Sequence, residues 1–351
     1  MVKASLRSRS LAIKLLAVFL VLAMPSCPRR PEPAGGPQLT FAAVGEVRPS
    51  LQGEPLFSEG ERSRVFDQVA PLLGEREFVL FDFAGAVEFG CQPLAREEVH
   101  RWRPEWLVHL FNANLRVVNL ANDHALDCGR EALLKTMNAM MGQGFYLVGA
   151  GRSQREANAP IYLTRHGITI SLVSFLLDPP PGLDPCPECT GPSLYNRRAM
   201  ISALREMRER AGFRVVVLHF KERPLPRLES DELAVVREAI DFGADLVIGY
   251  GPGSGGGLYR IRGKWVVAGM GALTGDATDD PEKIVDGLLF CLEFSPAGMM
   301  NLRLAPVKLL EGRPSPLRGD EGEAVLEKLV AAGDSEVRNN ARIIGDILYL
   351  K

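Results

Sequence analysis

The 351-residue chain has only five histidines and lacks an excess of charge of either sign. Its 41 lysines and arginines nearly balance 43 aspartates and glutamates, which gives a formal net charge of −2. Proteins that bind nucleic acid use an excess of positive charge to neutralise phosphates, so we expect no nucleic acid among the partners. With 46% hydrophobic and 24% charged residues, the composition excludes a disordered chain or a collagen-like fibre.

The chain also lacks a long apolar run anywhere after its N-terminus. The run at 15–24 follows four basic residues and is shorter than the roughly 20 residues that span a bilayer, which is typical of a secretory signal. Ser26-Cys27, followed by a tether rich in proline and glycine at 28–38, resembles a bacterial lipoprotein signal. We therefore expect an exported protein of the cell envelope, attached to the membrane by a lipid on Cys27. A periplasmic protein with a plain secretory signal, or an uncleaved anchor, is the alternative, because Met24 and Pro25 depart from the lipoprotein pattern.

Cysteine is scarce, and its spacing does not match a zinc site. Cys186 and Cys189 form a single C-x-x-C in a proline-rich segment, without the second pair that a strong zinc motif would have. In an exported protein this favours a local disulfide or a surface loop. Besides Cys27 the chain has five cysteines, and an odd number cannot all pair within the chain.

From Leu39 onward, short apolar runs alternate with amphipathic stretches, which indicates an α/β fold. We expect one domain over 39–310, after a signal peptide at 1–27 and the tether at 28–38, and a helical C-terminal tail at 311–351. The expected strands are Leu39–Val44, Phe78–Phe83, Leu115–Asn119, Phe145–Val148, Ile161–Thr164, Ile168–Phe175, Arg214–His219 and Leu246–Gly249. The expected helices are Arg62–Leu73, Pro104–Asn112, Arg130–Gly142, Asn196–Arg210 and Asp231–Phe242, the last capped by Ser230. A hairpin around 262–264 and strands at 287–294 and 300–309 complete the domain.

Polar residues gather where several of the expected strands end. They are Glu46, Asp82, the segment 119–124 and the segment 219–222. In open α/β sheets, ligands bind beyond the carboxyl ends of the strands, so these ends predict one shared site. The glycine-rich segment 249–257 leads into a strand and not into a helix, which argues against a phosphate-binding loop.

The segment 119–129 reads N-L-A-N-D-H-A-L-D-C-G and resembles the A-N-N-H-x-x-D-x-G motif of the CapA family. This family, named for capsule or poly-γ-glutamate synthesis, is a branch of the calcineurin-like metallophosphoesterases. Further similar segments follow in the family's order, at 148–160, 217–222, 242–249 and 306–314. The resemblance covers about 39–330. It implies a metallophosphoesterase-like four-layer α/β/β/α sandwich, and as partners an extracellular polymer or its biosynthetic machinery.

The resemblance also implies a metal site, because two divalent cations in such a fold clamp a phosphoryl or similar group. Carried over by position, the metal ligands are Glu46, Asp82, Asn122 and His219, and the cofactor is a divalent metal such as Mn, Fe or Zn. Glu88 is the alternative to Asp82. His124 is the implied general acid, since an imidazole titrates near neutral pH.

Purely structural roles are the alternatives for these residues. Asn122 and His124 could hold a strand-to-helix turn through local hydrogen bonds, and His219 could be a satisfied residue at a strand end. The other histidines, His100, His109 and His166, match no motif and are expected to be surface or structural residues.

Two segments that carry ligands in the family lack them in this chain. The segment 249–253 reads G-Y-G-P-G where the family has histidines, and 269–273 reads G-M-G-A-L where it has an asparagine. These losses favour a non-catalytic binding or scaffolding protein with a degraded metal site, associated with capsule or poly-γ-glutamate synthesis or export. The alternative is a metal-dependent hydrolase or transferase with an altered one- or two-metal site.

Overall fold

The computed structural model describes residues 39–49, 59–89, 91, 98–181, 183, 186–276 and 283–351. The expected signal peptide, Cys27 and the tether lie outside the described residues. No helix in the described ranges is long and apolar enough to cross a membrane.

In the described part of the chain the larger sheet has nine strands, with β17 paired to β16 outside the main order β18-β19-β16-β15-β1-β2-β5-β6. Its strands in chain order are β1 (Leu39–Val47), β2 (Phe78–Phe83), β5 (Val117–Asn119), β6 (Tyr146–Val148), β15 (Gly287–Ser295), β16 (Gly298–Leu310), β17 (Arg313–Pro316), β18 (Ala341–Ile344) and β19 (Ile347–Leu350). Strands β1, β2, β5 and β6 run parallel, so their carboxyl ends meet at one edge.

The smaller sheet has the order β13-β14-β12-β11-β9-β8. Its strands are β8 (Ile161–Arg165), β9 (Ile168–Leu176), β11 (Phe213–His219), β12 (Leu246–Tyr250), β13 (Gly255–Ile261) and β14 (Lys264–Met270). Strands β9, β11, β12 and β14 are parallel, and two short pairs stand apart from both sheets. These pairs are β3 (Ala86–Val87) with β4 (Arg101–Trp102) and β7 (Ala150–Gly151) with β10 (Gly191–Pro192).

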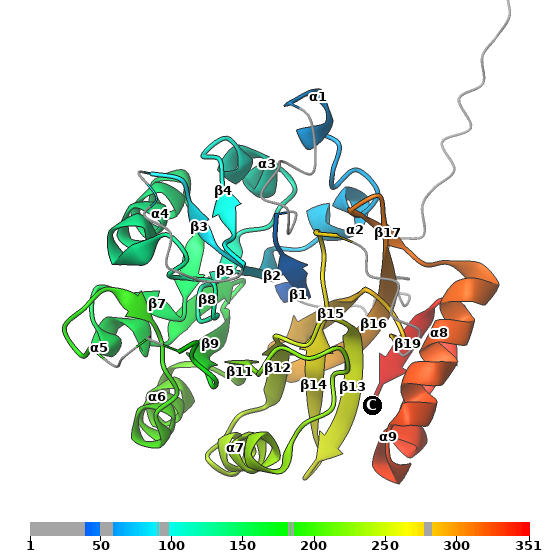
Figure 1. Cartoon of the computed structure of the whole chain (residues 1–351). Coiled ribbons are helices and arrows are strands. Elements are labelled where there is room, and N and C mark those ends of the chain that lie inside the picture. The colour runs from blue at the N-terminus through cyan, green and yellow to red at the C-terminus, as the bar shows by residue number, and fades with distance from the viewer. Residues whose placement is uncertain are drawn as a thin grey trace, which may run out of the picture.

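The two sheets pack face to face with helices on their outer faces (Figure 1). One apolar core joins the larger sheet to α2 (Ala70–Gly74), α3 (Trp106–Asn112) and α4 (Gly129–Gln143). A second core lies between the sheets, and a third joins the smaller sheet to α6 (Arg197–Arg210) and α7 (Ser230–Asp241). This layer order confirms the expected four-layer α/β/β/α sandwich.

The other helices lie at the margins of the sandwich. They are α1 (Glu59–Arg62), α5 (Gln154–Ala157), α8 (Gly319–Ala332) and α9 (Ser335–Asn340). Helices α8 and α9 both pack beside β13, the edge strand of the smaller sheet, and α8 also contacts β16, β18 and β19 of the larger sheet (Figure 1).

All eight listed strand segments form strands, and three of the expectations need correction. The segment 311–351 is not wholly helical, because its apolar end Ile347–Leu350 pairs with β16 and extends the larger sheet. The helix expected at 62–73 is broken into α1, a run of turns and α2, since Pro71 starts a new helix and cannot continue an old one. Helix α7 is capped by Glu229 in a capping box with Glu232, and not by Ser230.

The cysteines pair as two disulfides, Cys91–Cys128 and Cys186–Cys189. The second pair is the local disulfide, one of the two alternatives that the sequence left open. The first joins residue 91 to the residue just before α4, at the end of the 119–129 segment.

Candidate metal centre

Three neighbouring strands of the larger sheet bring polar side chains to the same edge. The register pairs Glu46 with Asp82 and Asp82 with Asn119 at the ends of β1, β2 and β5. Gly45 lets the end of β1 pack closely on the 271–273 loop, because a Cβ there would lie 2.6 Å from the carbonyl carbon of Ala272. Glu46 is then fixed by its main chain, whose N–H donates to Gly271 O at 2.7 Å.

His219, at the end of β11, approaches this edge from the smaller sheet. Its Nε2 lies 3.6 Å from Asp82 Oδ2 and 3.6 Å from Asp123 Oδ1. One ligand atom each of Glu46, Asp82 and His219 lie within 4.8 Å of one another, and all three residues are buried or nearly so. The structure thus brings together three of the four predicted metal ligands.

The side chain of Asn122, the fourth predicted ligand, makes three hydrogen bonds within the protein. Its Nδ2 donates to Asp82 Oδ1 at 3.2 Å and to Phe83 O at 2.8 Å, and its Oδ1 accepts from His124 N–H at 3.1 Å. Asn119 Nδ2 also donates to Asp82 Oδ1, at 2.5 Å. Asn122 therefore orients the carboxylate of Asp82 and the 122–124 turn, as the local alternative for this residue anticipated.

Asp123, next to Asn122, places a carboxylate between the two histidines of the site. Its two carboxylate oxygens face His219 and His124, at 3.6 Å and 3.8 Å from the Nε2 atoms of the two rings. Asp123 stands where the family motif has its second asparagine. The signal for it in the sequence is a carboxylate directly before His124, where the family motif has an amide.

His124 is oriented by Asp127, which follows one turn later. Its Nδ1 donates to Asp127 Oδ2 at 2.8 Å, and the same oxygen accepts from the main-chain N–H of His100 at 2.6 Å. Burial works against the charged imidazole, but the hydrogen bond to Asp127 and the nearby Asp123 outweigh it and raise the pKa of His124 to about 9. His124 therefore holds a proton at neutral pH, with its Nε2 turned toward the carboxylate cluster.

His100, expected to be a surface or structural residue, is buried beside this site and is not a surface residue. It is 1% exposed, and its ring stacks on that of His124 with centroids 3.7 Å apart. Gly85 makes this approach possible, since its φ is +108° and a Cβ there would lie 2.4 Å from His100 O. No sequence signal marks His100, because it reaches the site through the pairing of the short strands β3 and β4.

The carboxylates at the centre are buried close to one another, which disfavours their charged forms. Burial, and secondarily the charge of Asp123, raises the pKa of Glu46 to about 7 against the opposing effect of Arg48. Burial and the neighbouring Glu46 hold the pKa of Asp82 well above its usual range. Burial also lowers the pKa of His219 to about 4, so its ring is neutral at pH 7.

The two segments that lost family ligands contribute support in place of ligands. Tyr250 replaces a histidine at the end of β12, is fully buried, and donates from its hydroxyl to Val44 O at 2.9 Å. Its pKa is raised well above the usual value by burial and by the charges of Asp82 and Glu46. Glu88, the alternative to Asp82, instead lies 3.8 Å from Arg101 with a half-exposed side chain.

These residues have the chemistry of a divalent-cation site. Three groups in the described part of the chain place ligand atoms close enough to share an ion: Glu46, Asp82 and His219; Asp123, His124 and Glu222; and Glu98, His100 and His124. Asp82 Oδ2, the oxygen 3.6 Å from His219 Nε2, is buried and has no hydrogen-bond partner among the described residues. Two donors about 2.1 Å from one ion at a tetrahedral angle are about 3.4 Å apart, close to the observed 3.6 Å separations. The residues present therefore fit a metal ion.

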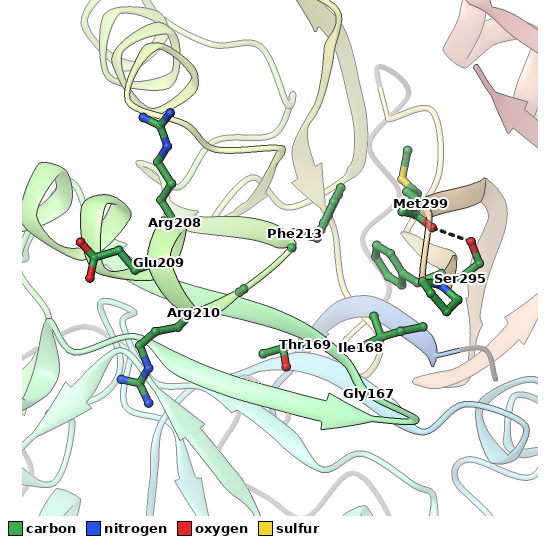
Figure 2. A pocket seen from close by; sticks show the side chains of 14 residues that line it. Gly167, Ile168, Thr169, Arg208, Glu209, Arg210, Phe213, Ser295 and Met299 are labelled. Atoms are coloured by element: carbon green, nitrogen blue, oxygen red, sulfur yellow. Dashed lines mark hydrogen bonds between the residues drawn. The ribbon is translucent and has the colours of Figure 1, made fainter. Parts of the chain in front are cut away.

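A separate cavity of about 390 Å³ lies at the opposite edge of the strands, between the start of β9, the α6–β11 loop and the β15–β16 turn (Figure 2). Phe213 and Phe294 meet edge to face in its lining. It contains no residue of the three ligand groups found in the described ranges. The chemistry of the fold is thus concentrated at the carboxyl ends of the strands.

The matching family and two relatives carry capsule or PGA biosynthesis in their descriptions. The family described as "Bacterial capsule synthesis protein PGA_cap" matches residues 40–277. The PGA biosynthesis protein CapA of Bacillus subtilis (strain 168) is 22% identical over 285 residues, covering 80% of this chain and 74% of that protein. The capsule biosynthesis protein CapA of Bacillus anthracis is 23% identical over 292 residues, covering 80% and 70%. Among solved structures, the NAD nucleotidase of Haemophilus influenzae aligns with 88% of this chain and 69% of its own, at 12% identity and a TM-score of 0.42.

Proposed function

Because the chain belongs to the family of bacterial capsule synthesis proteins described as PGA_cap, we propose that it acts at the cell envelope in making, exporting or anchoring an extracellular polymer. The names of the two Bacillus relatives, which refer to capsule and PGA biosynthesis, support this role. The partner is then a polymer such as capsule or poly-γ-glutamate, or the machinery that makes it. Lipidation of Cys27 would hold the domain at the membrane.

The site supports a metal-dependent hydrolase or transferase better than a passive scaffold. The observation that carries this proposal is the gathering of the carboxylates of Glu46, Asp82 and Asp123, the first two of them buried, around the neutral ring of His219. Carboxylates out of water are costly unless they are paired or bind a cation, and a polymer-binding scaffold gains nothing from that cost. A bound divalent cation would offset the burial and the charge repulsion that raise the pKa values of Glu46 and Asp82.

In this proposal Glu46, Asp82, Asp123 and His219 hold a divalent metal such as Mn, Fe or Zn. When bound, the metal polarises the substrate and lowers the pKa of a bound water. Asp82 is kept in its orientation by the amides of Asn119 and Asn122. His219 enters as a neutral donor, which a metal requires of an imidazole.

His124 completes the machinery as the general acid. Its proton lies on Nε2, on the side of the ring that faces Asp123, because Nδ1 is held by Asp127. A protonated imidazole in this position can donate to the leaving group when a phosphoester or amide bond breaks. The stacked ring of His100 covers one face of His124 and keeps water from it.

One observation favours the scaffold hypothesis as a second candidate. Tyr250 occupies the position of a family histidine, and its hydroxyl is bonded to the main chain of β1 and not turned to a ligand. The site has therefore lost a donor on the side of the smaller sheet. A non-catalytic member would use the same crevice to hold polymer or partner.

The deciding experiment measures metal and activity separately on the full chain. We expect the purified protein to contain close to one equivalent of Mn, Fe or Zn by mass spectrometry, and His219→Ala to lose it. His166→Ala is the matched control, because His166 is about half exposed and far along the sequence from the centre. His124→Ala should keep the metal and lose hydrolysis of a phosphodiester or a γ-glutamyl amide. A protein that stays metal-free and inert with added Mn²⁺ would contradict the enzyme proposal.

A further inference from the structure

Arg48 lies directly after β1, two residues beyond the proposed ligand Glu46, and its main chain is locked in place. Its N–H donates to Thr274 Oγ1 at 3.1 Å, and the same hydroxyl donates to Arg48 O at 3.0 Å. Its side chain runs across Gly275, where a Cβ would lie 2.8 Å from both Cγ and Nε of the arginine. The fold thus holds a guanidinium at the rim of the site and leaves room for it with a glycine.

The guanidinium of Arg48 is well buried but poorly partnered. Its side chain is 11% exposed, and Nε is buried without a hydrogen-bond partner among the described residues. Its one ion pair in those ranges is with Glu222, where Nη1 and Oε1 are 3.8 Å apart, too far for a hydrogen bond. A buried charge held this way has hydrogen-bond donors left for a further acceptor, and an unmade hydrogen bond of a charged group is costly.

Glu222 is a loosely held neighbour of this guanidinium. Its side chain is 54% exposed, and its carboxylate lies within 4.8 Å of ligand atoms of Asp123 and His124. A carboxylate therefore already stands beside Arg48 at the mouth of the site, in a position that costs little to vacate. The next arginine, Arg223, is fully used by main-chain oxygens and by Glu232.

The geometry points to Arg48 as the substrate-recognition residue of the site, which binds a carboxylate of the substrate in place of the carboxylate of Glu222. An arginine forms two parallel hydrogen bonds to a carboxylate, which its contact with Glu222 does not provide. This inference rests on the proposed function, since it requires an anionic polymer at the site. It adds a specificity element: the polymer presents a free carboxylate next to the bond that reacts, and Glu222 competes for its place.

The test is a calorimetric titration. The full chain is loaded with Mn²⁺, and a short γ-linked glutamate oligomer is added to it. Arg48→Gln should weaken binding by about 10- to 100-fold, because a charge-assisted bidentate pair is lost. Glu222→Gln should tighten binding by up to about fivefold, as expected for the loss of an exposed competing ion pair. Lys221→Gln is the matched control, because it removes an exposed positive charge from the neighbouring position and should leave affinity unchanged.

The double variant Arg48→Gln/Glu222→Gln separates recognition from general electrostatics. If Glu222 acts by competing for Arg48, its substitution should bring no gain once Arg48 is gone. A gain of the same size in both backgrounds would overturn the inference, as would unchanged binding by Arg48→Gln or equal losses in Arg48→Gln and Lys221→Gln. A wild-type preference for inorganic phosphate over the oligomer would also overturn it.

Metal content and thermal unfolding, measured on every variant, keep this test apart from the proposed function. Arg48→Gln that folds and keeps its metal but binds the oligomer normally refutes the recognition role alone. Wild-type protein that binds the oligomer through Arg48 but holds no metal refutes the metal proposal alone.

Discussion

Replacing Asp127 with asparagine should change how the stability of the protein depends on pH. In the folded protein the hydrogen bond from His124 to Asp127 raises the pKa of His124 to about 9, although burial opposes this. The usual value is 6.5. A histidine whose pKa is raised by folding contributes stability that is fully present below pH 6.5 and is lost as the pH rises through 9. The shift corresponds to about 3 kcal/mol.

Asp127→Asn removes the charge but keeps one oxygen acceptor. In the variant, this uncharged oxygen accepts the two hydrogen bonds that Asp127 Oδ2 accepts in the wild type, from the ring of His124 and from the main-chain N–H of His100. We expect a loss of about 2–3 kcal/mol in the free energy of unfolding at pH 6. Because the wild-type advantage depends on protonated His124, the difference between the two proteins should narrow by more than about 1 kcal/mol between pH 6.5 and 9.5.

The assay is urea denaturation of both proteins at several pH values, with chelator present so that no metal contributes. Asp67→Asn, an exposed substitution of the same kind, is the control and should differ from wild type by a constant small amount. A wild-type advantage that stays the same from pH 6 to 9.5 would refute the reasoning, because Asp127 would then act on a neutral imidazole.

Three further outcomes are expected. Gly85→Ala should lower stability by about 3 kcal/mol in thermal unfolding, since its φ is +108° and the new methyl would meet the neighbouring strand, whereas Gly60→Ala has open space and should cost nothing. Replacing Cys91 and Cys128 together by serine should lower the free energy of unfolding by about 4 kcal/mol in denaturant, because that disulfide closes a loop of 37 residues. A wild-type stability that reductant leaves unchanged would contradict the presence of the disulfide. Asn122→Ala should cost about 2–3 kcal/mol, as three buried hydrogen bonds are lost, and a near-neutral effect in the same assay would show that the turn holds without it.

Local pattern was enough to predict the elements of the fold. Apolar runs bounded by polar or glycine residues predicted the parallel strands of the larger and smaller sheets, because burial on both faces selects such runs, but not the short parallel pair of β3 and β4. The errors lie where local and tertiary effects compete. Pro71 split an expected helix, and the short apolar run Ile347–Leu350 became a strand because β16 offered it an edge.

The candidate site was only partly predictable. Glu46, Asp82, His124 and His219 are at strand ends or in a recognisable motif, and the structure brings them together. The ligand role expected for Asn122 stays a prediction, since its side chain also holds Asp82 and the 122–124 turn, and the carboxylate of Asp123 beside it was given no role. Arg48 gave no signal, since a single arginine after a strand is unremarkable until its partners are known.

By itself, the sequence determined the family, the α/β class and the edge of the sheets where the chemistry gathers. These follow from the order of motifs and from the way parallel strands align their carboxyl ends. Only the tertiary structure decided which side chains meet there. His100 reaches His124 through the β3–β4 pair, and His219 reaches Asp82 from the other sheet. The physical reason is that burial and contact distances between residues far apart in the chain set both the protonation states and the free donors, and no local pattern encodes them.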